Sequence, residues 1–224
     1  MVLSLAGEKD ANAQARQFGD QGQLAITAEN LFGFSTERTA VQGDNDSERA
    51  ESNTQFGLFY RGVQHSPRAP WVGGHYFVIP NLSIGATLGF QTAGGSTTLK
   101  TSGTSTTTDD PSAFGFIFLP KVGYALMLNN MMGFWFRGGP GIVTSSSSGP
   151  DDNSPTNSST FWLLSLDANF IVTPVQYIGF SAGPQFNMSV AGSYSSERMG
   201  TTVSQDASFR SFSIDAGLFG YFDL

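Results

Sequence analysis

Apolar and polar side chains alternate with a period of two residues over much of this sequence. In the run 82–91 one parity is apolar, while the other holds only small or polar residues. The apolar positions are Leu82, Ile84, Ala86, Leu88 and Phe90. Because successive side chains of a β-strand point to opposite faces, the run predicts a strand with one apolar and one small, polar face.

Eight segments share this alternation, and turn-forming residues separate each from the next. The segments are roughly residues 22–36, 68–79, 82–91, 112–126, 131–143, 160–172, 175–190 and 208–222. Each segment is long enough for the roughly 9–11 residues with which a tilted strand crosses a bilayer. The sequence therefore predicts an all-β chain with eight transmembrane strands.

The connections between these segments alternate in length. Short turns are predicted at Pro80-Asn81, Asn129-Asn130 and Thr173-Pro174. Long polar connections are predicted at roughly 37–67, 94–111, 144–159 and 191–207. Short periplasmic turns and long extracellular loops are the layout of an up-and-down outer-membrane β-barrel. Within the first long connection, residues 53–64 stay unassigned, and one reading extends the 68–79 strand outward beyond the membrane.

Composition and charge exclude several other classes. No window of 18 apolar residues free of charge exists, which argues against a transmembrane helix. The net charge is −7 and the 11 Lys and Arg residues are scattered, so we expect no nucleic-acid partner. With no cysteine and two histidines, we expect no transition-metal site, and no hydrolase motif indicates an enzyme.

Alternation alone does not decide which face meets lipid, because a soluble lipocalin-like barrel alternates with its apolar face inside. Here the apolar face carries large residues, and the other face carries Gly, Ser, Thr and Asn. Such small polar residues suit the narrow interior of an eight-stranded barrel. We therefore expect the apolar face to contact lipid.

Charged residues of both signs have lumenal parity within the predicted strands. Charges are costly against lipid and unpaired charges are costly when buried, so we predict an ion-pair and hydrogen-bond network that plugs the lumen. Its predicted members are Glu29, His75, Lys121, Arg137, Asp167 and Asp215. Two alternatives remain open: solvated groups at the rim, or a gated conduit along the same charges. His75 is expected to form hydrogen bonds rather than to catalyse a reaction.

The N-terminal residues 1–21 are expected to lie outside the barrel, which we assign to residues 22–224. Met1 to Ala6 is short and apolar, and Ala13-Gln14-Ala15 has the small-x-small form of a signal-peptidase site. The apolar stretch is too short for a complete signal peptide. Residues 1–21 are interpreted either as the remnant of a longer signal peptide or as a disordered segment.

The run from Gly74 to Gly85, GHYFVIPNLSIG, resembles a hairpin of the outer membrane protein β-barrel domain family, the OmpA/OmpX-like group of proteobacteria. Residues 120–125 and 135–139 resemble the next hairpin of that group. The resemblance covers roughly residues 22–224, and it implies eight antiparallel strands, insertion by the barrel assembly machinery and no cofactor. One departure is the end of the chain, where Asp223 and Leu224 follow Phe222.

These observations predict a protein of the Gram-negative outer membrane with a plugged polar lumen and a structural or surface-interaction role through its long loops. Its expected contacts are outer-membrane lipid and lipopolysaccharide, and we expect a monomer. The alternatives are a small, porin-like, low-conductance pore and a soluble secreted β-barrel that binds a ligand. We predict no metal, no cofactor and no enzymatic activity.

Overall fold

The structure, a computed structural model, describes residues 17–42, 48–58, 70–101, 104–150 and 154–224. These residues form strands and turns. The strands are β1 (Gln23–Gln42), β2 (Glu48–Leu58), β3 (Trp71–Ile79), β4 (Leu82–Ala93), β5 (Ser96–Thr101), β6 (Thr104–Asp109), β7 (Ser112–Met127), β8 (Met132–Ser148), β9 (Thr156–Val175), β10 (Ile178–Arg198) and β11 (Thr201–Asp223). A search of the described residues finds no helix with the length and hydropathy to cross a membrane.

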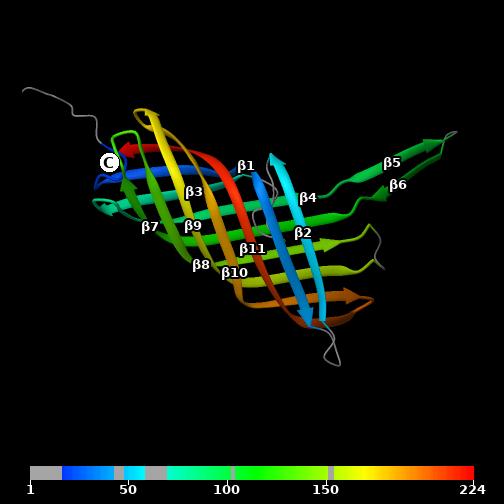
Figure 1. The fold of residues 1–224 in the computed structure, drawn as a ribbon. Coiled ribbons are helices and arrows are strands. Elements are labelled where there is room, and N and C mark those ends of the chain that lie inside the picture. The colour runs from blue at the N-terminus through cyan, green and yellow to red at the C-terminus, as the bar shows by residue number, and fades with distance from the viewer. Residues whose placement is uncertain (1–16, 43–47, 59–69, 102–103, 151–153) are drawn as a thin grey trace, which may run out of the picture.

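Eight of these strands close into a ring in the order β1, β3, β4, β7, β8, β9, β10, β11. β11 returns to β1 in a long antiparallel ladder that runs from Gln23↔Asp223 to Val41↔Ala207. Figure 1 shows the strands inclined around a common axis, with the C-terminus at the end where the short turns lie. The predicted eight-stranded antiparallel barrel is confirmed.

β2 lies outside this ring of eight and continues the line of β3. Residues 24–29 of β1 pair with β3, and residues 32–42 of β1 pair with β2. Between the two ladders, Asn30 has a positive φ of 58° and the register with β11 shifts, which marks a bulge. The part of the 53–64 segment that the structure describes thus extends the wall beyond β3, and residues 59–64 lie outside the described residues.

The long connections predicted between strands are built largely of strand. β1, β8, β9, β10 and β11 continue well past the predicted segments, and β5 and β6 pair only with each other in a ribbon that projects from the barrel (Figure 1). Ser and Thr hydroxyls bond across these extensions, as in the Ser145–Ser159 and Ser195–Ser204 pairs, both 2.9 Å between Oγ atoms. Such cross-strand pairs stabilise a sheet, so Ser/Thr tracts form ladders here.

Two of the three short turns lie where the sequence places them, at Pro80-Asn81 and around Asn129-Asn130. The third prediction was wrong: the chain reverses at Gln176-Tyr177, and Pro174 lies within β9. Tyr177 has a φ of 71°, which the turn requires. The backbone N–H of Thr173 donates to Met131 O at 2.8 Å, and this bond keeps residue 173 in the ladder.

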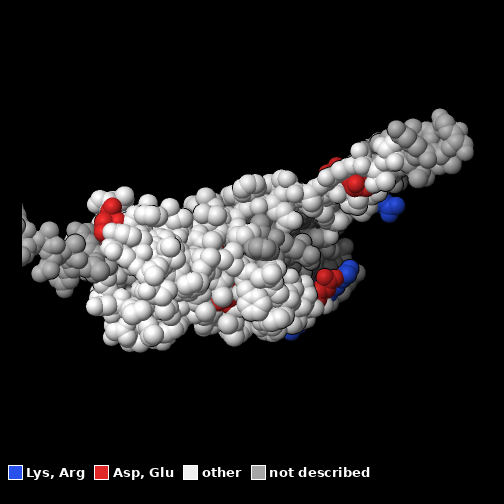
Figure 2. Space-filling model, turned by 90° about the horizontal axis from the view of Figure 1, so that it is seen from above, with Lys and Arg blue, Asp and Glu red and all other residues white. Residues whose placement is uncertain are grey.

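The large apolar side chains of even parity point away from the barrel axis. Leu166, Phe180 and Ile84 are about half exposed, whereas Lys121 is 3% and Asp167 is 6% exposed. In Figure 2 the charged side chains on the visible face gather mainly at the two ends, and a broad uncharged surface lies between them. An apolar outer surface is the reverse of a soluble barrel, whose exterior is polar.

A layered lumen as the candidate functional site

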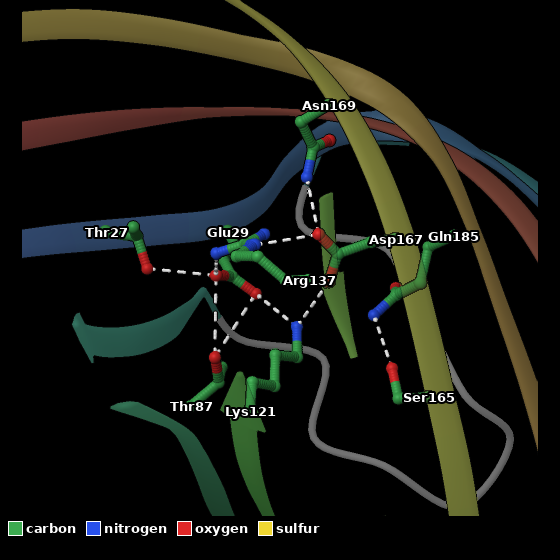
Figure 3. Close-up of polar contacts among 9 residues, drawn as sticks. All are labelled: Thr27, Glu29, Thr87, Lys121, Arg137, Ser165, Asp167, Asn169 and Gln185. Carbon is green, nitrogen blue, oxygen red and sulfur yellow. Dashed lines mark hydrogen bonds and ion pairs between the residues drawn. The ribbon is translucent and has the colours of Figure 1, made fainter. Parts of the chain in front are cut away.

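Four charged side chains meet at the centre of the lumen (Figure 3). Lys121 Nζ lies 2.7 Å from Asp167 Oδ2 and 3.5 Å from Glu29 Oε2. Arg137 donates from Nε to Asp167 Oδ1 at 2.7 Å and from Nη1 to Glu29 Oε1. Each cation therefore contacts both carboxylates, and the four charges cancel.

The network crosses the barrel from wall to wall. Arg137 and Asp167 are direct partners on β8 and β9, and Lys121 lies on the adjacent β7. Glu29 comes from β1, whose ladder partners are β2, β3 and β11. The bonds from Glu29 to Lys121 and Arg137 therefore span the lumen rather than one sheet ladder.

Neutral side chains complete the coordination of the two carboxylates. Thr27 Oγ1 donates to Glu29 Oε1 at 3.0 Å, and Thr87 Oγ1 approaches the same atom at 3.4 Å. Asn169 Nδ2 donates to Asp167 Oδ1 at 2.9 Å. The Arg137 guanidinium also lies 4.6 Å from the ring centroid of Trp135, a cation–π contact. Both buried carboxylates, of Glu29 and Asp167, therefore accept hydrogen bonds from neutral side chains as well as from the two cations.

The structure places the other two predicted members beside the network. His75 is fully buried and meets Trp135 edge to face at 4.9 Å between ring centroids. Neither ring nitrogen of His75 has a hydrogen-bond partner among the described residues. The sequence had predicted that His75 forms hydrogen bonds in the lumen. Asp215 is buried on β11, and its Oδ1 likewise has no partner there.

An aromatic layer fills the lumen at the end where the short turns lie. Phe18, from the chain segment that precedes β1, lies 4.8–5.4 Å from the rings of Phe77, Trp135, Phe219 and Tyr221. Gly19, with a φ of 101°, turns the segment, and its carbonyl accepts from Asn81 N at 2.7 Å. Sequence reasoning missed Phe18, and its only sequence signal was a single Phe between polar residues. Residues 1–16 lie outside the described residues, so the signal-peptide interpretation stays a prediction.

A second apolar layer closes the lumen on the other side of the charges, toward the end opposite the short turns. Its buried members come from β3, β7, β8, β9 and β11. They are Trp71, Ile117, Leu119, Val143, Phe161, Leu163, Ala207 and Phe209. The expectation of a lumen filled mainly by small polar groups therefore needs correction. Gly89 makes room for this layer, because a Cβ there would lie 2.5 Å from Trp71 Cδ1.

The described part of the chain contains no group of three or more His, Asp or Glu residues arranged to hold a metal ion. The second histidine, His65, and the acidic residues Asp44, Asp46, Asp151 and Asp152 lie outside the described residues. The chemistry available within the described lumen is therefore that of buried ion pairs and aromatic packing.

No protein-family model matches the chain, and no curated protein resembles it in sequence. Solved structures do resemble its fold. The outer membrane protein AlkL, determined by solid-state NMR in DMPC lipid bilayers, covers 100% of this chain and 98% of its own, with 12% identity and a TM-score of 0.54. The crystal structure of the outer membrane protein OprG from Pseudomonas aeruginosa covers 92% and 98%, with 10% identity and a TM-score of 0.52. The chain thus has the fold of an outer-membrane β-barrel, and the resemblance inferred from the sequence is confirmed for the fold.

Proposed function

We propose that this chain is a monomeric barrel of the Gram-negative outer membrane, closed to solutes, that acts through its extracellular surface. The fold of the chain and the apolar exterior of the barrel support a location in the outer membrane. The proposal includes delivery by a signal peptide, which residues 1–21 suggest, and insertion by the barrel assembly machinery, which the family resemblance implies. It leaves out enzymatic activity, since His75 is fully buried and packs edge to face against Trp135.

The central ion network is the observation that carries the closed state. A hydrated ion crossing the barrel would have to separate Glu29 and Asp167 from Lys121 and Arg137, all at most 6% exposed. Breaking a buried pair is costly because it leaves an uncompensated charge in a poorly solvated site. Apolar layers above and below the network add a second barrier, since neither layer solvates an ion.

The extracellular extensions support a role at the surface. β10 and β11 continue to Arg198 and Thr201, far past their last large lipid-facing residues, and the β5–β6 ribbon projects beyond the barrel (Figure 1). Most exposed positions at this end are polar and rich in Ser and Thr, and Met199 and Val203 are the exposed apolar exceptions at the tip of β10 and β11. A rigid, polar projection of this kind suits contact with a partner or with the envelope more than it suits transport.

Planar-bilayer recording tests the closed state. The refolded barrel is expected to give no stable single-channel steps, whereas a large porin recorded in the same bilayer gives them. Stable, repeated steps from the purified chain would overturn the proposal and favour the small pore.

Surface labelling of intact cells tests the orientation. A short epitope inserted between β5 and β6 is expected to bind antibody on intact cells. The matched control carries the epitope in the Pro80-Asn81 turn and is expected to bind only after the outer membrane is permeabilised. Labelling of the control on intact cells would contradict the proposed orientation.

A further inference from the structure

Asp215 is a buried carboxylate that the central ion network does not use. It lies on the inner face of β11 and is 9% exposed, and its Oδ1 atom has no hydrogen-bond partner among the described residues. Its direct partners in the two flanking ladders are Gly33 of β1 and Gly183 of β10, so no side chain of those partners donates to it. A buried acceptor without a donor is destabilising, and a charged one more so, so this carboxylate needs a partner.

The two cations of the network, Lys121 and Arg137, are already neutralised by other carboxylates. Each of them bonds both Glu29 and Asp167, so these four charges cancel. Their attraction for Asp215 is opposed by repulsion from Glu29 and Asp167. An ionised Asp215 therefore adds a negative charge beside a neutral network, and a buried charge of this kind needs a counter-charge.

Two further oxygen atoms without a donor lie next to Asp215 on the inner wall. Ser213 is the neighbouring inward residue of β11 and is fully buried, and its Oγ has no partner among the described residues. Gln185 of β10 lies directly opposite Ser213. The Nε2 atom of Gln185 donates to Ser165 Oγ at 3.4 Å (Figure 3), so the amide offers its oxygen, and Oε1 has no partner in the described part of the chain.

The spacing of these three residues brings their oxygen atoms within reach of one ligand. Opposite residues of an antiparallel pair have Cβ atoms about 4.5–5.5 Å apart, and neighbouring residues on one face of a strand are about 7 Å apart. A carboxylate, a hydroxyl and an amide oxygen therefore border the same part of the lumen.

The chemistry of these groups selects the class of ligand. Carboxylate, hydroxyl and amide oxygens are ligands of hard cations. One positive charge offsets the charge that Asp215 adds, whereas a divalent ion would leave an excess positive charge in a site away from water. A water molecule would supply donors but no charge, so it would leave the carboxylate uncompensated.

We propose that Asp215, Ser213 and Gln185 hold a monovalent metal cation, such as Na⁺, beside the ion network. The ion would be taken up as the barrel folds, and the apolar layers at both ends of the lumen would retain it. Its charge would complete the neutralisation of the lumen. The proposal revises the expectation of no metal for this one class of ion, and it does not depend on the proposed role of the extracellular surface.

Equilibrium unfolding of the full chain by urea in phosphatidylcholine vesicles tests the site. Sodium chloride is compared with choline chloride at the same ionic strength, because choline is too large to replace Na⁺. The folding equilibrium constant is expected to be at least about tenfold larger in about 150 mM Na⁺, which corresponds to a Kd of about 17 mM or lower. Equal constants in the two salts would overturn the proposal.

Asp215→Asn keeps the shape of the side chain and removes its charge, so its folding constants in the two salts are expected to agree within about twofold. Asp206→Asn is the matched control, because it removes the same charge from an exposed position on the same strand. It is expected to keep the full preference for Na⁺. A full preference in Asp215→Asn would show that the ion binds elsewhere and would overturn the site.

Should Asp215→Asn fail to fold, Ser213→Ala removes a neutral ligand from the same site. The preference for Na⁺ is then expected to fall to about threefold or less, because the ion loses one of its oxygen ligands. An unchanged preference in Ser213→Ala would contradict the proposed ligand set.

Two further measurements identify the ion and its position. Calcium chloride added to the choline solution is expected to raise the folding constant by less than about twofold, and a gain larger than that given by Na⁺ would overturn the monovalent assignment. Crystals of the full chain grown with Tl⁺, a monovalent cation with strong anomalous scattering, are expected to show a peak beside Asp215 Oδ1 that Asp215→Asn lacks. Anomalous peaks only at other positions would overturn the site.

Discussion

An ion pair between arginine and a carboxylate affects the stability of the barrel differently at the centre of the lumen and at the surface. Arg137 bonds Glu29 and Asp167 with side chains at most 5% exposed, whereas Arg49 and Glu51 pair at 2.6 Å with side chains 82% and 55% exposed. Water already solvates the surface pair, so its separation costs little. In the lumen no water replaces the lost partner, so the loss leaves a buried charge.

Arg137→Ala is therefore expected to lower the free energy of unfolding by about 3–5 kcal/mol, since Glu29 and Asp167 each lose a donor. Arg49→Ala is the matched control and is expected to change it by about 1 kcal/mol or less. Urea titration in lipid vesicles, followed by tryptophan fluorescence, measures both. Equal losses for the two variants would show that the lumenal charges are solvated rather than paired.

At the scale of elements, the segment before β1 belongs to the barrel. Gly22 N donates to Phe77 O at 2.9 Å, and Leu224 N donates to Gly22 O at 3.1 Å, so the segment joins β3 to the chain end. These bonds hold Phe18 in the mouth of the barrel at the end of the short turns, where it is 1% exposed. A short terminal segment therefore completes the packing that the strands leave open.

Phe18→Ala is expected to destabilise the barrel by about 3 kcal/mol, because it empties a site enclosed by four aromatic rings. The control is Phe180→Ala on the lipid-facing side of β10, where the ring is 51% exposed. Lipid chains can fill the space that this ring leaves, so a clearly smaller loss is expected. If denaturant unfolding gave the reverse order, the aromatic layer would not be a packed core.

At the scale of the whole molecule, closure of β1 onto β11 leaves a continuous apolar exterior and encloses the charges. The outward residues of neighbouring strands lie side by side in register, as in the row formed by Val122, Gly138 and Leu166. Because the band has no charged member at this level, hydrocarbon can surround the barrel without a desolvation penalty.

A charge placed in this band tests its contact with lipid. Leu166→Arg is expected to destabilise the barrel by about 2–4 kcal/mol in vesicles, the cost of an arginine near the bilayer midplane. Thr202→Arg, at the exposed far end of β11, is expected to have little effect. Leu166 is 52% exposed in the absence of lipid, so a neutral Leu166→Arg would mean that the band meets water.

The sequence by itself determined the eight strands of the ring, the face of each that points outward and the inward position of the six predicted polar residues. The strands follow from the period of two, and the facing follows from the size and charge of the side chains on each face, both of which are local properties of the chain. Only the tertiary structure decided which of those charges meet, because Glu29 reaches Lys121 and Arg137 across the lumen from a strand that is not their neighbour. The apolar layers and Phe18 were likewise decided by closure, since the side chains that fill a lumen depend on the radius and stagger of the ring, which no single strand encodes.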